Sequence, residues 1–408
     1  MRQLTIIEGA PDDEIAKVAH ELLHLRAETR SRALAERLVA LYHELGDVAT
    51  TRFFRVLLDE FGADRETVDA AIEAYRDDPS EANTVALSEV ADSERLALFR
   101  ALNTADGGIE VLLDMRSELR RRRRMYPELA PVERDLRHLL DSWFNRGFLR
   151  LEQLDWRTPA HILESLIRYE AVHEIRGWDD LRRRLAPDRR SFGFFHPALP
   201  NEPIIFLEVA LVKGLTETIH EILDAPPPGA VPADVDTAIF YAITNCQPGL
   251  RGISFGSFLI KQVTERLRSE LPQLRTFATL SPIPGFAGWL ERHHRSLDRN
   301  DRHAMETACA QYLVGVRRDG LPLDPVARFH LRNGACIERI NFEGDRSDKG
   351  MGESHGLLVN YLYSDQDLAA NHDALTLDGV VTASPVVLGM VGTSVDDELY
   401  RVRGPLRR

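Results

Sequence analysis

The sequence predicts an α+β protein, in which an N-terminal all-helical domain is followed by a mixed α/β domain. Up to about residue 175, apolar residues recur three and four positions apart, as in "DDEIAKVAHELLHLRAETRSRALAERLVALYHEL". After residue 175, β-rich apolar runs bounded by proline, glycine and aspartate follow, as in "EPIIFLEVALV" and "DTAIFYAITNC". We therefore expect a helical domain over residues 1–175 and an α/β domain over residues 176–408.

The helical domain is expected to contain several antiparallel helices. Interior glycine and proline are rare, and the breaks at 103–108 and 127–131 are typical of turns between helices. Five consecutive arginines, Arg120 to Arg124, are interpreted as a solvated helix face, with a contact to another subunit or an acidic partner as the alternative.

The composition limits the class of protein. With 408 residues the chain is long enough for about two domains, and its net charge of −13 argues against a general nucleic-acid binder. No apolar run approaches the roughly 20 residues of a membrane span. The three cysteines fit a reducing compartment, and the N-terminus lacks a secretory or transit pattern. We therefore expect a cytoplasmic protein without membrane or nucleic-acid partners.

The clearest unit of the second domain is a strand, a helix and a second strand. "TAIFYAITNCQ" (237–247) predicts a strand, "SFLIKQVTERLRSEL" (257–271) an amphipathic helix, and "RTFATLS" (275–281) the next strand. Because such a unit has parallel strands, the loop at 247–256 and Ser281 are both expected at the carboxyl ends of the strands. This is the edge at which open α/β sheets bind ligands.

The loop of this unit predicts an anion site. Gly249, Gly252 and Gly256 let backbone amides approach a ligand, and a helix that begins near Gly256 directs unpaired N–H groups there. Three cations lie nearby in sequence: Arg251, Lys261 and Arg275. The glycine spacing matches neither a dinucleotide-binding nor a nucleoside-triphosphate motif, and a plain tight turn is the alternative.

"LSPIPGF" (280–286) ends the second strand at a hydroxyl group. Pro282 and Pro284 have no N–H to donate to a ladder, so the strand is expected to stop at Ser281. The position at a strand end makes Ser281 a candidate site residue, and capping of the following helix, "GFAGWLERHHRSL", is the alternative role.

"DPVARFHLRNGACIERINF" (324–342) predicts a short helix followed by a strand. Asp324 fits the N-cap, Pro325 the first turn, and Asn333-Gly334 the end of the helix. His330 lies inside this helix, and the alternative to a catalytic role is a buried, hydrogen-bonded histidine. A further strand is expected in "HGLLVNYLYS" (355–364).

The order of these elements resembles the acyl-CoA-binding core of the GNAT acetyltransferase superfamily. The resemblance implies that the loop holds the coenzyme A pyrophosphate and that the pantetheine arm lies between the two parallel strands. The usual loop pattern is Arg or Gln, any two residues, Gly, any residue, then Gly or Ala. Arg251 and Gly256 fit this pattern, whereas Ser254 stands where the middle glycine is expected.

Longer stretches are similar to the malonyl-CoA decarboxylase family. They are "YEAVHEIRGWDDLRRRL", "HPALPNEPIIFLEVAL", "LRGISFGSFLIK", "LSPIPGFAGWL" and "RFHLRNGACIERIN", in this order and after a helical domain. The resemblance covers most of the chain from about residue 165, and it implies that Ser281 and His330 are the catalytic pair. It also implies that the coenzyme A loop consists of Arg251, Gly252, Ile253, Ser254, Phe255, Gly256 and Ser257.

The resemblance implies decarboxylation of malonyl-CoA to acetyl-CoA and carbon dioxide. Loss of carbon dioxide leaves an enolate on the thioester, which is itself the electron sink, so no metal or organic cofactor is expected. We expect Ser281 to hydrogen-bond the thioester or carboxylate and His330 to deliver the proton or polarise the carbonyl, and these roles can be exchanged. A GNAT-type acyl-CoA acyltransferase and a non-catalytic CoA-binding regulatory protein are the alternatives. The resemblance also implies a homo-oligomer, a dimer or tetramer, that associates through the helical domain.

Two other segments have weaker functional interpretations. "HELLH" (20–24) has the spacing of two zinc ligands, but the sequence offers no third ligand, so no metal site is expected. "NFEGDRSDKGMGESHGLLVNY" (341–361) is interpreted as a mobile loop before a strand, near enough to His330 to touch the acyl group.

Overall fold

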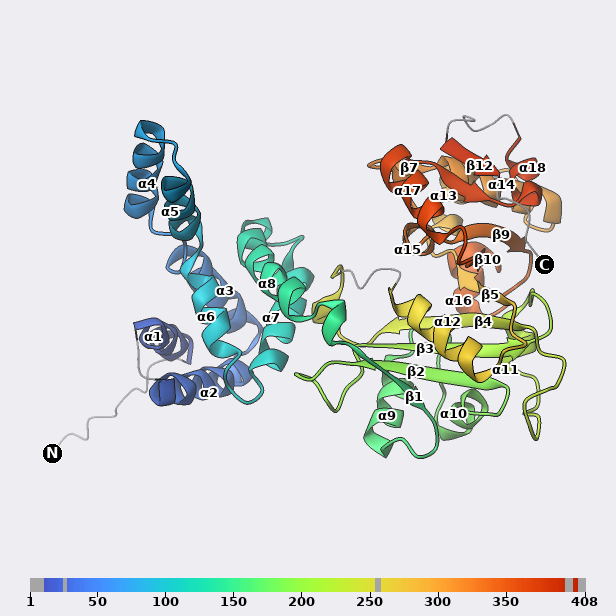
Figure 1. The fold of residues 1–408 in the computed structure, drawn as a ribbon, viewed down its shortest axis with the longest axis horizontal. Helices are drawn as coiled ribbons and strands as arrows, with labels where there is room; N and C mark the ends of the chain where they lie inside the picture. The colour runs from blue at the N-terminus through green and yellow to red at the C-terminus, as the bar shows by residue number, and fades with distance from the viewer. Residues whose placement is uncertain (1–10, 25–27, 254–257, 393–398, 403–408) are drawn as a thin grey trace. The chain divides into compact units, whose positions relative to one another are not determined.

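The computed structural model describes residues 11–24, 28–253, 258–392 and 399–402. The residues form two compact units. One contains the chain up to Leu149 with segments 196–200 and 247–254, and the other contains the rest. The predicted α+β class, a helical region followed by a mixed sheet, is confirmed (Figure 1). The change of composition near residue 175 lies inside the second unit, which already begins at Arg150.

The first unit is built from helices around one apolar core. Phe54, Phe99, Val111 and Leu136, from four different helices, are fully buried in this core. The predicted breaks coincide with the segments that separate α6 from α7 and α7 from α8. The elements are α1 (Pro11–His24), α2 (Glu28–Glu44), α3 (Asp47–Asp59), α4 (Arg65–Asp77), α5 (Glu81–Ala91), α6 (Glu94–Leu102), α7 (Gly108–Arg122), the 3₁₀ turn η1 (Pro127–Leu129), α8 (Ala130–Trp143) and the 3₁₀ turn η2 (Arg146–Phe148).

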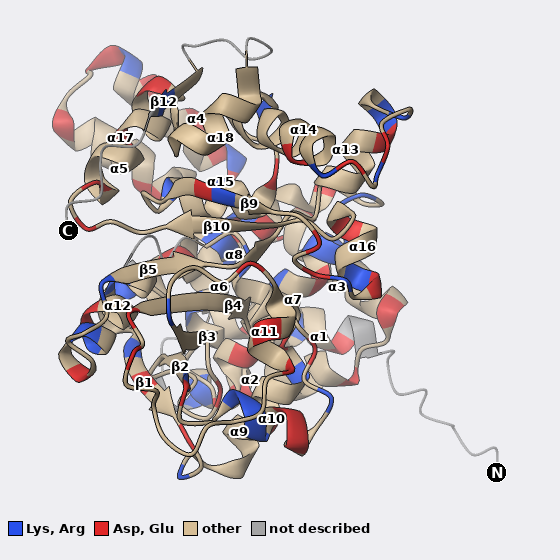
Figure 2. Ribbon diagram, turned by 90° about the vertical axis from the view of Figure 1, so that its right-hand side faces the viewer, with Lys and Arg blue, Asp and Glu red and all other residues tan. Residues whose placement is uncertain are grey.

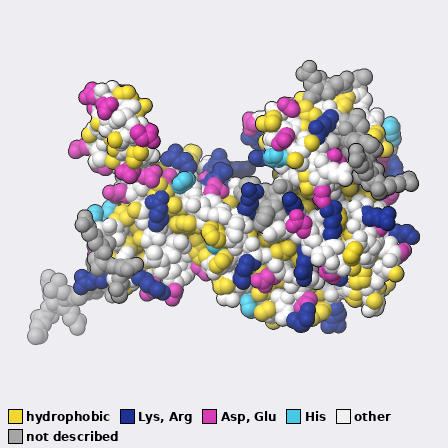
Figure 3. Space-filling model, in the orientation of Figure 1, with side chains coloured by type: hydrophobic (Ala, Val, Ile, Leu, Met, Phe, Trp, Pro, Cys, Tyr) yellow, Lys and Arg dark blue, Asp and Glu magenta, His cyan; other side chains and the backbone are white. Residues whose placement is uncertain are grey.

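Helices α4 and α5 form a hairpin that buries none of its own residues. Tyr75 and Val85 are among its exposed apolar side chains. Figure 3 shows acidic and apolar side chains together on the visible face of this hairpin, at the upper left. The hairpin therefore lacks an apolar core of its own.

The arginine run closes α7 and is only partly solvated. Arg122 is buried and forms ion pairs with Asp47, at 2.5 Å, and with Glu118. Arg121 is exposed and binds the same two carboxylates. The prediction of a solvated helix face is therefore wrong for Arg122, because Asp47 of α3 and Glu118, one turn earlier in α7, supply acidic partners inside this unit.

The second unit is organised around a mixed sheet. Its elements are β1 (Arg150–Leu154), α9 (Ala160–Tyr169), α10 (Trp178–Arg184), β2 (Arg189–Phe195), β3 (Ile205–Val212), α11 (Ile219–Leu223), β4 (Thr237–Asn245), α12 (Phe258–Glu270), β5 (Thr276–Thr279), β6 (Ser281–Pro282), α13 (Phe286–His293), α14 (Arg302–Gly315), β7 (Arg317–Arg318), β8 (Leu321–Pro322), α15 (Pro325–Arg332), β9 (Cys336–Asn341), α16 (Asp348–Ser354), β10 (Leu358–Leu362), α17 (Leu368–Asp378), β11 (Val381–Ala383), α18 (Pro385–Val391) and β12 (Tyr400–Val402). The 3₁₀ turn η3 (Pro248–Leu250) follows β4 and belongs to the first unit.

In the described part of the chain the large sheet has the order β1-β2-β3-β4-β5-β10-β9-β11-β12, with β6 beside β10. Figure 2 labels β1 to β5, then β10, β9 and β12, in this succession from bottom to top. The first four strands are antiparallel, β4 and β5 are parallel, and β10 is antiparallel to β5 and β9. The parallel β4–α12–β5 unit, the principal prediction for this half, is confirmed.

Helices cover both faces of this sheet (Figure 1). Ala278 and Leu280 of the β5 region pack in one cluster with Ile219 of α11. Phe277 points to the opposite face because side chains alternate along a strand, and Arg268 of α12 lies over its ring at 4.7 Å. The sheet is therefore buried on both sides, as parallel strand pairs require.

The two parallel strands separate toward their carboxyl ends. Their ladder runs from Thr237–Thr276 to Phe240–Thr279, and Leu280 N–H makes the last bond, 3.0 Å, to the Phe240 carbonyl. Residues 242–245 of β4 pair with β3 and have no partner in β5. The edge at which a ligand was expected is therefore the edge at which these strands part.

The prediction that strand structure stops at Ser281 is wrong, because a further short strand begins there. Ser281 and Pro282 form β6, which pairs with Val359 and Leu358 of β10. Proline is tolerated because β6 has one neighbouring strand, so its missing N–H need not enter a second ladder. The chain then turns away at Gly285, as the proline content predicts.

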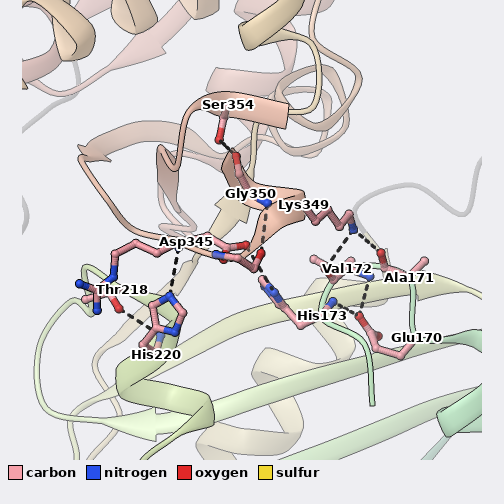
Figure 4. A network of polar contacts seen from close by, with 12 residues as sticks. Glu170, Ala171, Val172, His173, Thr218, His220, Asp345, Lys349, Gly350 and Ser354 are labelled. Carbon is pink, nitrogen blue, oxygen red and sulfur yellow. Dashed lines mark hydrogen bonds and ion pairs between the residues drawn. The ribbon is translucent and has the colours of Figure 1, made fainter. Parts of the chain in front are cut away.

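The segment predicted as a mobile loop is folded. It contains α16, which Ser347 caps by accepting a hydrogen bond of 3.1 Å from Gly350 N–H. Figure 4 shows Lys349 reaching the carbonyls of Ala171 and Val172, the latter at 3.0 Å. The prediction failed because these partners lie far away in sequence. Helix α16 packs against β6, the strand that carries Ser281.

Candidate active site

The two residues singled out in the sequence meet in the structure. Ser281, on β6, and His330, on α15, are 49 positions apart, and Ser281 Oγ lies 3.0 Å from His330 Nε2. Both side chains are about one-twentieth exposed. A hydroxyl and an imidazole at this distance form a buried hydrogen-bonded pair.

Local sequence fixes the helix that carries His330. Asp324 caps α15 by accepting bonds from Val326 N–H (2.9 Å) and Ala327 N–H (3.0 Å), as predicted. Gly334 follows the helix with φ of +83°, and a Cβ there would overlap the Leu368 carbonyl. His330 therefore lies in the last turn of a helix whose two ends are both fixed.

Asp324 also links the histidine helix to the serine segment. Its second carboxylate oxygen accepts a bond of 3.2 Å from Gly285 N–H, in the turn after β6. The carboxylate is buried, and Tyr312 also hydrogen-bonds it. One side chain thus holds both "SPIPG" and the start of "PVARFH".

Two tyrosines of the β10 segment complete the surroundings of His330. The hydroxyl of Tyr363 lies 2.8 Å from His330 Nδ1, and the ring of Tyr361 stacks on the imidazole with centroids 4.7 Å apart. Both tyrosines are buried. Neither tyrosine was predicted as a site residue, although the alternation in "NYLYS" predicts that both point to one face of a strand.

Thr279 determines the direction of the hydrogen bonds. Ser281 donates its hydroxyl proton to Thr279 Oγ1 at 2.8 Å, and Tyr361 N–H donates to the same oxygen at 3.1 Å. With its one proton directed to Thr279, Ser281 Oγ would accept from a His330 tautomer that carries its hydrogen on Nε2. Nδ1 in turn accepts the Tyr363 O–H. In this arrangement a neutral imidazole pairs with both Ser281 and Tyr363.

Burial enforces this neutral state. It lowers the pKa of His330 from 6.5 to about 3. The same effect raises the pKa of Tyr363 well above its ordinary value, so its hydroxyl keeps its proton. At neutral pH the free site presents an N–H donor rather than an imidazolium.

Replacement of Tyr363 by phenylalanine is expected to lower kcat about five- to tenfold with little change in KM. The ring stays packed, but one buried hydrogen bond, worth about 1 kcal/mol, no longer holds the imidazole. Steady-state kinetics check this. Tyr361→Phe is the matched control, because the Tyr361 hydroxyl has no hydrogen-bond partner among the described residues. Equal losses in both variants would contradict the role of Tyr363.

The alternative that Ser281 caps the following helix is not what the structure shows. The N-cap of α13 is Gly285, which makes no side-chain capping bond, and the Ser281 hydroxyl is directed to Thr279 instead. For His330 the alternative of a buried, hydrogen-bonded histidine is correct as a description. It does not exclude a role in catalysis.

The coenzyme A loop is described only in part. Arg251 is exposed, Gly252 has φ of +84°, and Ile253 is buried. The remaining predicted residues, Ser254, Phe255, Gly256 and Ser257, lie outside the described residues. The loop therefore remains a prediction.

Arg275 does not belong to the predicted group of cations. Its N–H donates to the Asp236 carbonyl, so it lies where the parallel strands begin. The loop follows the carboxyl end of β4, at the opposite edge, and the length of β5 separates the two. Nearness in sequence was misleading here.

His20 of "HELLH" stacks on Phe61 at 4.3 Å and contacts Glu60 at 2.8 Å. Across residues 11–24, 28–253, 258–392 and 399–402 no group of three or more His, Cys, Asp or Glu is placed to hold a metal ion. The helices in these ranges include none that is both long and apolar enough to span a membrane.

Comparison with known proteins shows to which family the chain belongs. A family model of the malonyl-CoA decarboxylase C-terminal domain matches residues 147–302 and 299–399, and one of the N-terminal domain matches residues 61–144. The "Malonyl-CoA decarboxylase, mitochondrial" of Anser anser anser is 35% identical over 346 residues, which are 72% of this chain and 69% of that relative.

Solved structures agree with this match. The malonyl-CoA decarboxylase of Rhodopseudomonas palustris is 45% identical, with a TM-score of 0.87, over 92% of this chain and 98% of that one. The malonyl-CoA decarboxylase of Agrobacterium vitis is also 45% identical, with a TM-score of 0.87, over 93% of this chain and 100% of that one. With both family models and nearly full-length structural matches in agreement, the chain belongs to the malonyl-CoA decarboxylase family.

Proposed function

We propose that this protein decarboxylates malonyl-CoA to acetyl-CoA and carbon dioxide, with Ser281 and His330 as its catalytic pair. The observation that carries the proposal is the 3.0 Å contact between Ser281 Oγ and His330 Nε2, in a chain of this family. Ser281 also comes just after the end of β5, at the edge where β4 and β5 separate. This is the edge at which α/β sheets bind ligands.

The reaction asks two things of the protein. The bond between the carboxylate carbon and the α-carbon breaks, and its electron pair moves into the thioester to give an enolate. A hydrogen-bond donor at the enolate oxygen stabilises the developing charge, and one such donor is worth roughly 10²–10³ in rate. The α-carbon then takes up one proton, which is ultimately replaced from solvent, and acetyl-CoA results.

The neutral state of His330 favours one of its two roles. With a pKa of about 3, the free enzyme at neutral pH holds very little imidazolium, so His330 is a poor source of the proton. A neutral N–H is still a good donor to the enolate oxygen, as in other sites where a neutral histidine polarises a carbonyl. We therefore propose that His330 polarises the thioester and that Ser281 hydrogen-bonds the substrate beside it.

The pH dependence tests this assignment. We expect log(kcat/KM) to show no step from His330 between about pH 5.5 and 8, because this ratio reports the free enzyme and the histidine stays neutral throughout. A histidine that had to be protonated at its ordinary pKa would lower the ratio tenfold per pH unit above about 6.5. A slope of −1 there, absent in His330→Gln, would contradict the neutral-donor role.

The activity itself is tested by incubating the purified protein with malonyl-CoA, without metal or acceptor, and following product masses. Acetyl-CoA and carbon dioxide are expected. Malonyl-CoA that binds but stays intact would contradict the proposal. Acyl transfer to an added amine would instead favour the acyltransferase alternative.

We also propose self-association through the helical unit and a cytoplasmic location. The exposed apolar residues of the α4–α5 hairpin, including Tyr75 and Val85, support association, because the hairpin buries no residue of its own. Light scattering on the whole chain and on Val85→Asp tests this, with a lower mass expected for the variant.

Some relatives have "mitochondrial" in their names, so fractionation of cells tests the location.

A further inference from the structure

The first part of the predicted coenzyme A loop packs closely on α7. A Cβ at Gly249 would overlap the backbone of Leu113, so only glycine fits this contact. Arg116, one turn further along α7, donates a hydrogen bond to the Gly249 carbonyl. Both partners belong to the first compact unit. The helical region therefore forms the support on which this loop begins.

The guanidinium of Arg116 is fully occupied by contacts to Gly249 and Glu133. Its guanidinium is buried, and its Nε and Nη2 atoms both lie 3.0 Å from Glu133 Oε1. A buried arginine with its charge paired and its donors occupied holds the loop, but it is not available to a ligand.

Arg120 is differently placed. It follows Arg116 by four positions, so it lies on the same face of α7. Its Nη1 atom is 3.9 Å from the position that a Cβ would take at Gly252. Its nearest carboxylate is Glu133, at 3.8 Å, which already serves Arg116. The side chain is about one-third exposed, so it can reach a ligand on the surface of the loop.

The neighbours of Arg120 in the arginine run differ from it. Arg121 and Arg122 are bound to Asp47 and Glu118, on another side of the helix. Arg251 is exposed next to Gly252. Arg120 and Arg251 thus both lie next to Gly252, which has no side chain. Glu133 is shared by Arg116 and Arg120, so positive charge is in excess here.

We infer that Arg120 of α7 binds a phosphate group of the acyl-CoA together with Arg251. Guanidinium groups are suited to phosphate oxygens because they offer paired N–H donors and a permanent charge. The inference rests on the proposed function for the ligand class, and it gives the helical region a part in substrate binding. The phosphate is either the 3′-phosphate or the pyrophosphate of coenzyme A.

The test compares Arg120→Gln with Arg121→Gln, its neighbour on the same helix. For Arg120→Gln we expect KM for malonyl-CoA and Kd for free coenzyme A, by calorimetry, to rise about tenfold, with kcat nearly unchanged. Arg121→Gln should change neither. Arg251→Gln should resemble Arg120→Gln, and combining the two should raise Kd further. Equal thermal midpoints check that the variants fold.

The outcomes separate this inference from the proposed function. Calorimetry with coenzyme A needs no turnover, so a wild-type protein that binds coenzyme A without decarboxylation would refute only the activity. An unchanged Kd in Arg120→Gln, or an equal rise in Arg121→Gln, would overturn the role of Arg120. Repetition with 3′-dephospho-coenzyme A identifies the group. If Arg120→Gln no longer raises Kd for this ligand, Arg120 binds the 3′-phosphate. If Kd still rises, Arg120 binds the pyrophosphate.

Discussion

Replacement of His330 by alanine is expected to lower kcat for malonyl-CoA by roughly 10²–10³, with KM changed little. The loss follows from its position: His330 Nε2 is a donor in a buried site, and no other N–H is seen beside Ser281 Oγ among the described contacts. A buried donor is worth more than an exposed one, because water does not compete with it.

The control for this variant is His372→Ala, which removes an exposed histidine on α17. His330→Gln is a second variant, because its amide keeps an N–H and fills more of the space under the Tyr361 ring. It should retain more activity than alanine. Turnover of His330→Ala within about threefold of the wild type, in a protein that folds normally, would refute a catalytic histidine.

Replacement of Ser281 by alanine is expected to lower kcat about 10²-fold while coenzyme A still binds. The change removes the hydroxyl that joins His330 to Thr279, so the imidazole loses its alignment, and the substrate loses a hydroxyl that would turn to it from Thr279. Kinetics on malonyl-CoA and calorimetry with coenzyme A separate the two effects.

Ser165→Ala is the matched control, because Ser165 is also buried and donates one hydrogen bond, of 2.9 Å, to His161. The double variant of Ser281 and His330 should lose much less than the product of the single losses, since the two residues act as one unit. A Ser281→Ala protein with turnover within about threefold of the wild type would exclude the serine from the mechanism.

Local features of this fold could be predicted from the sequence. The cap at Asp324, the break after Asn333 and the strands around α12 follow from the preferences of a few neighbouring residues, and all are confirmed. The pairing of Ser281 with His330 was expected from family resemblance. The spacing of the residues alone does not predict this pairing, because it depends on the contact between α15 and β6.

The misses share a physical reason. Tyr363, the α16 contacts of Lys349 and the position of Arg120 beside Gly252 all join segments more than 30 residues apart. The order of strands β5, β10 and β9 decides the first of these, and no local preference encodes that order. Arg275 was assigned to the wrong edge because nearness along the chain was taken for nearness in space.

The carboxylate of Asp324 makes two motifs depend on each other. It caps the histidine helix and accepts the Gly285 amide, while the Tyr312 hydroxyl occupies the space that a Cβ at 285 would need. Residues 285, 312 and 324 should therefore co-vary among relatives, since a change at one leaves the others unpaired or crowded. Grafting "SPIPGF" alone onto another scaffold would transfer the serine without the anchor that holds it in register with its histidine. A transplanted site would therefore need "SPIPGF", the histidine helix and Asp324 together.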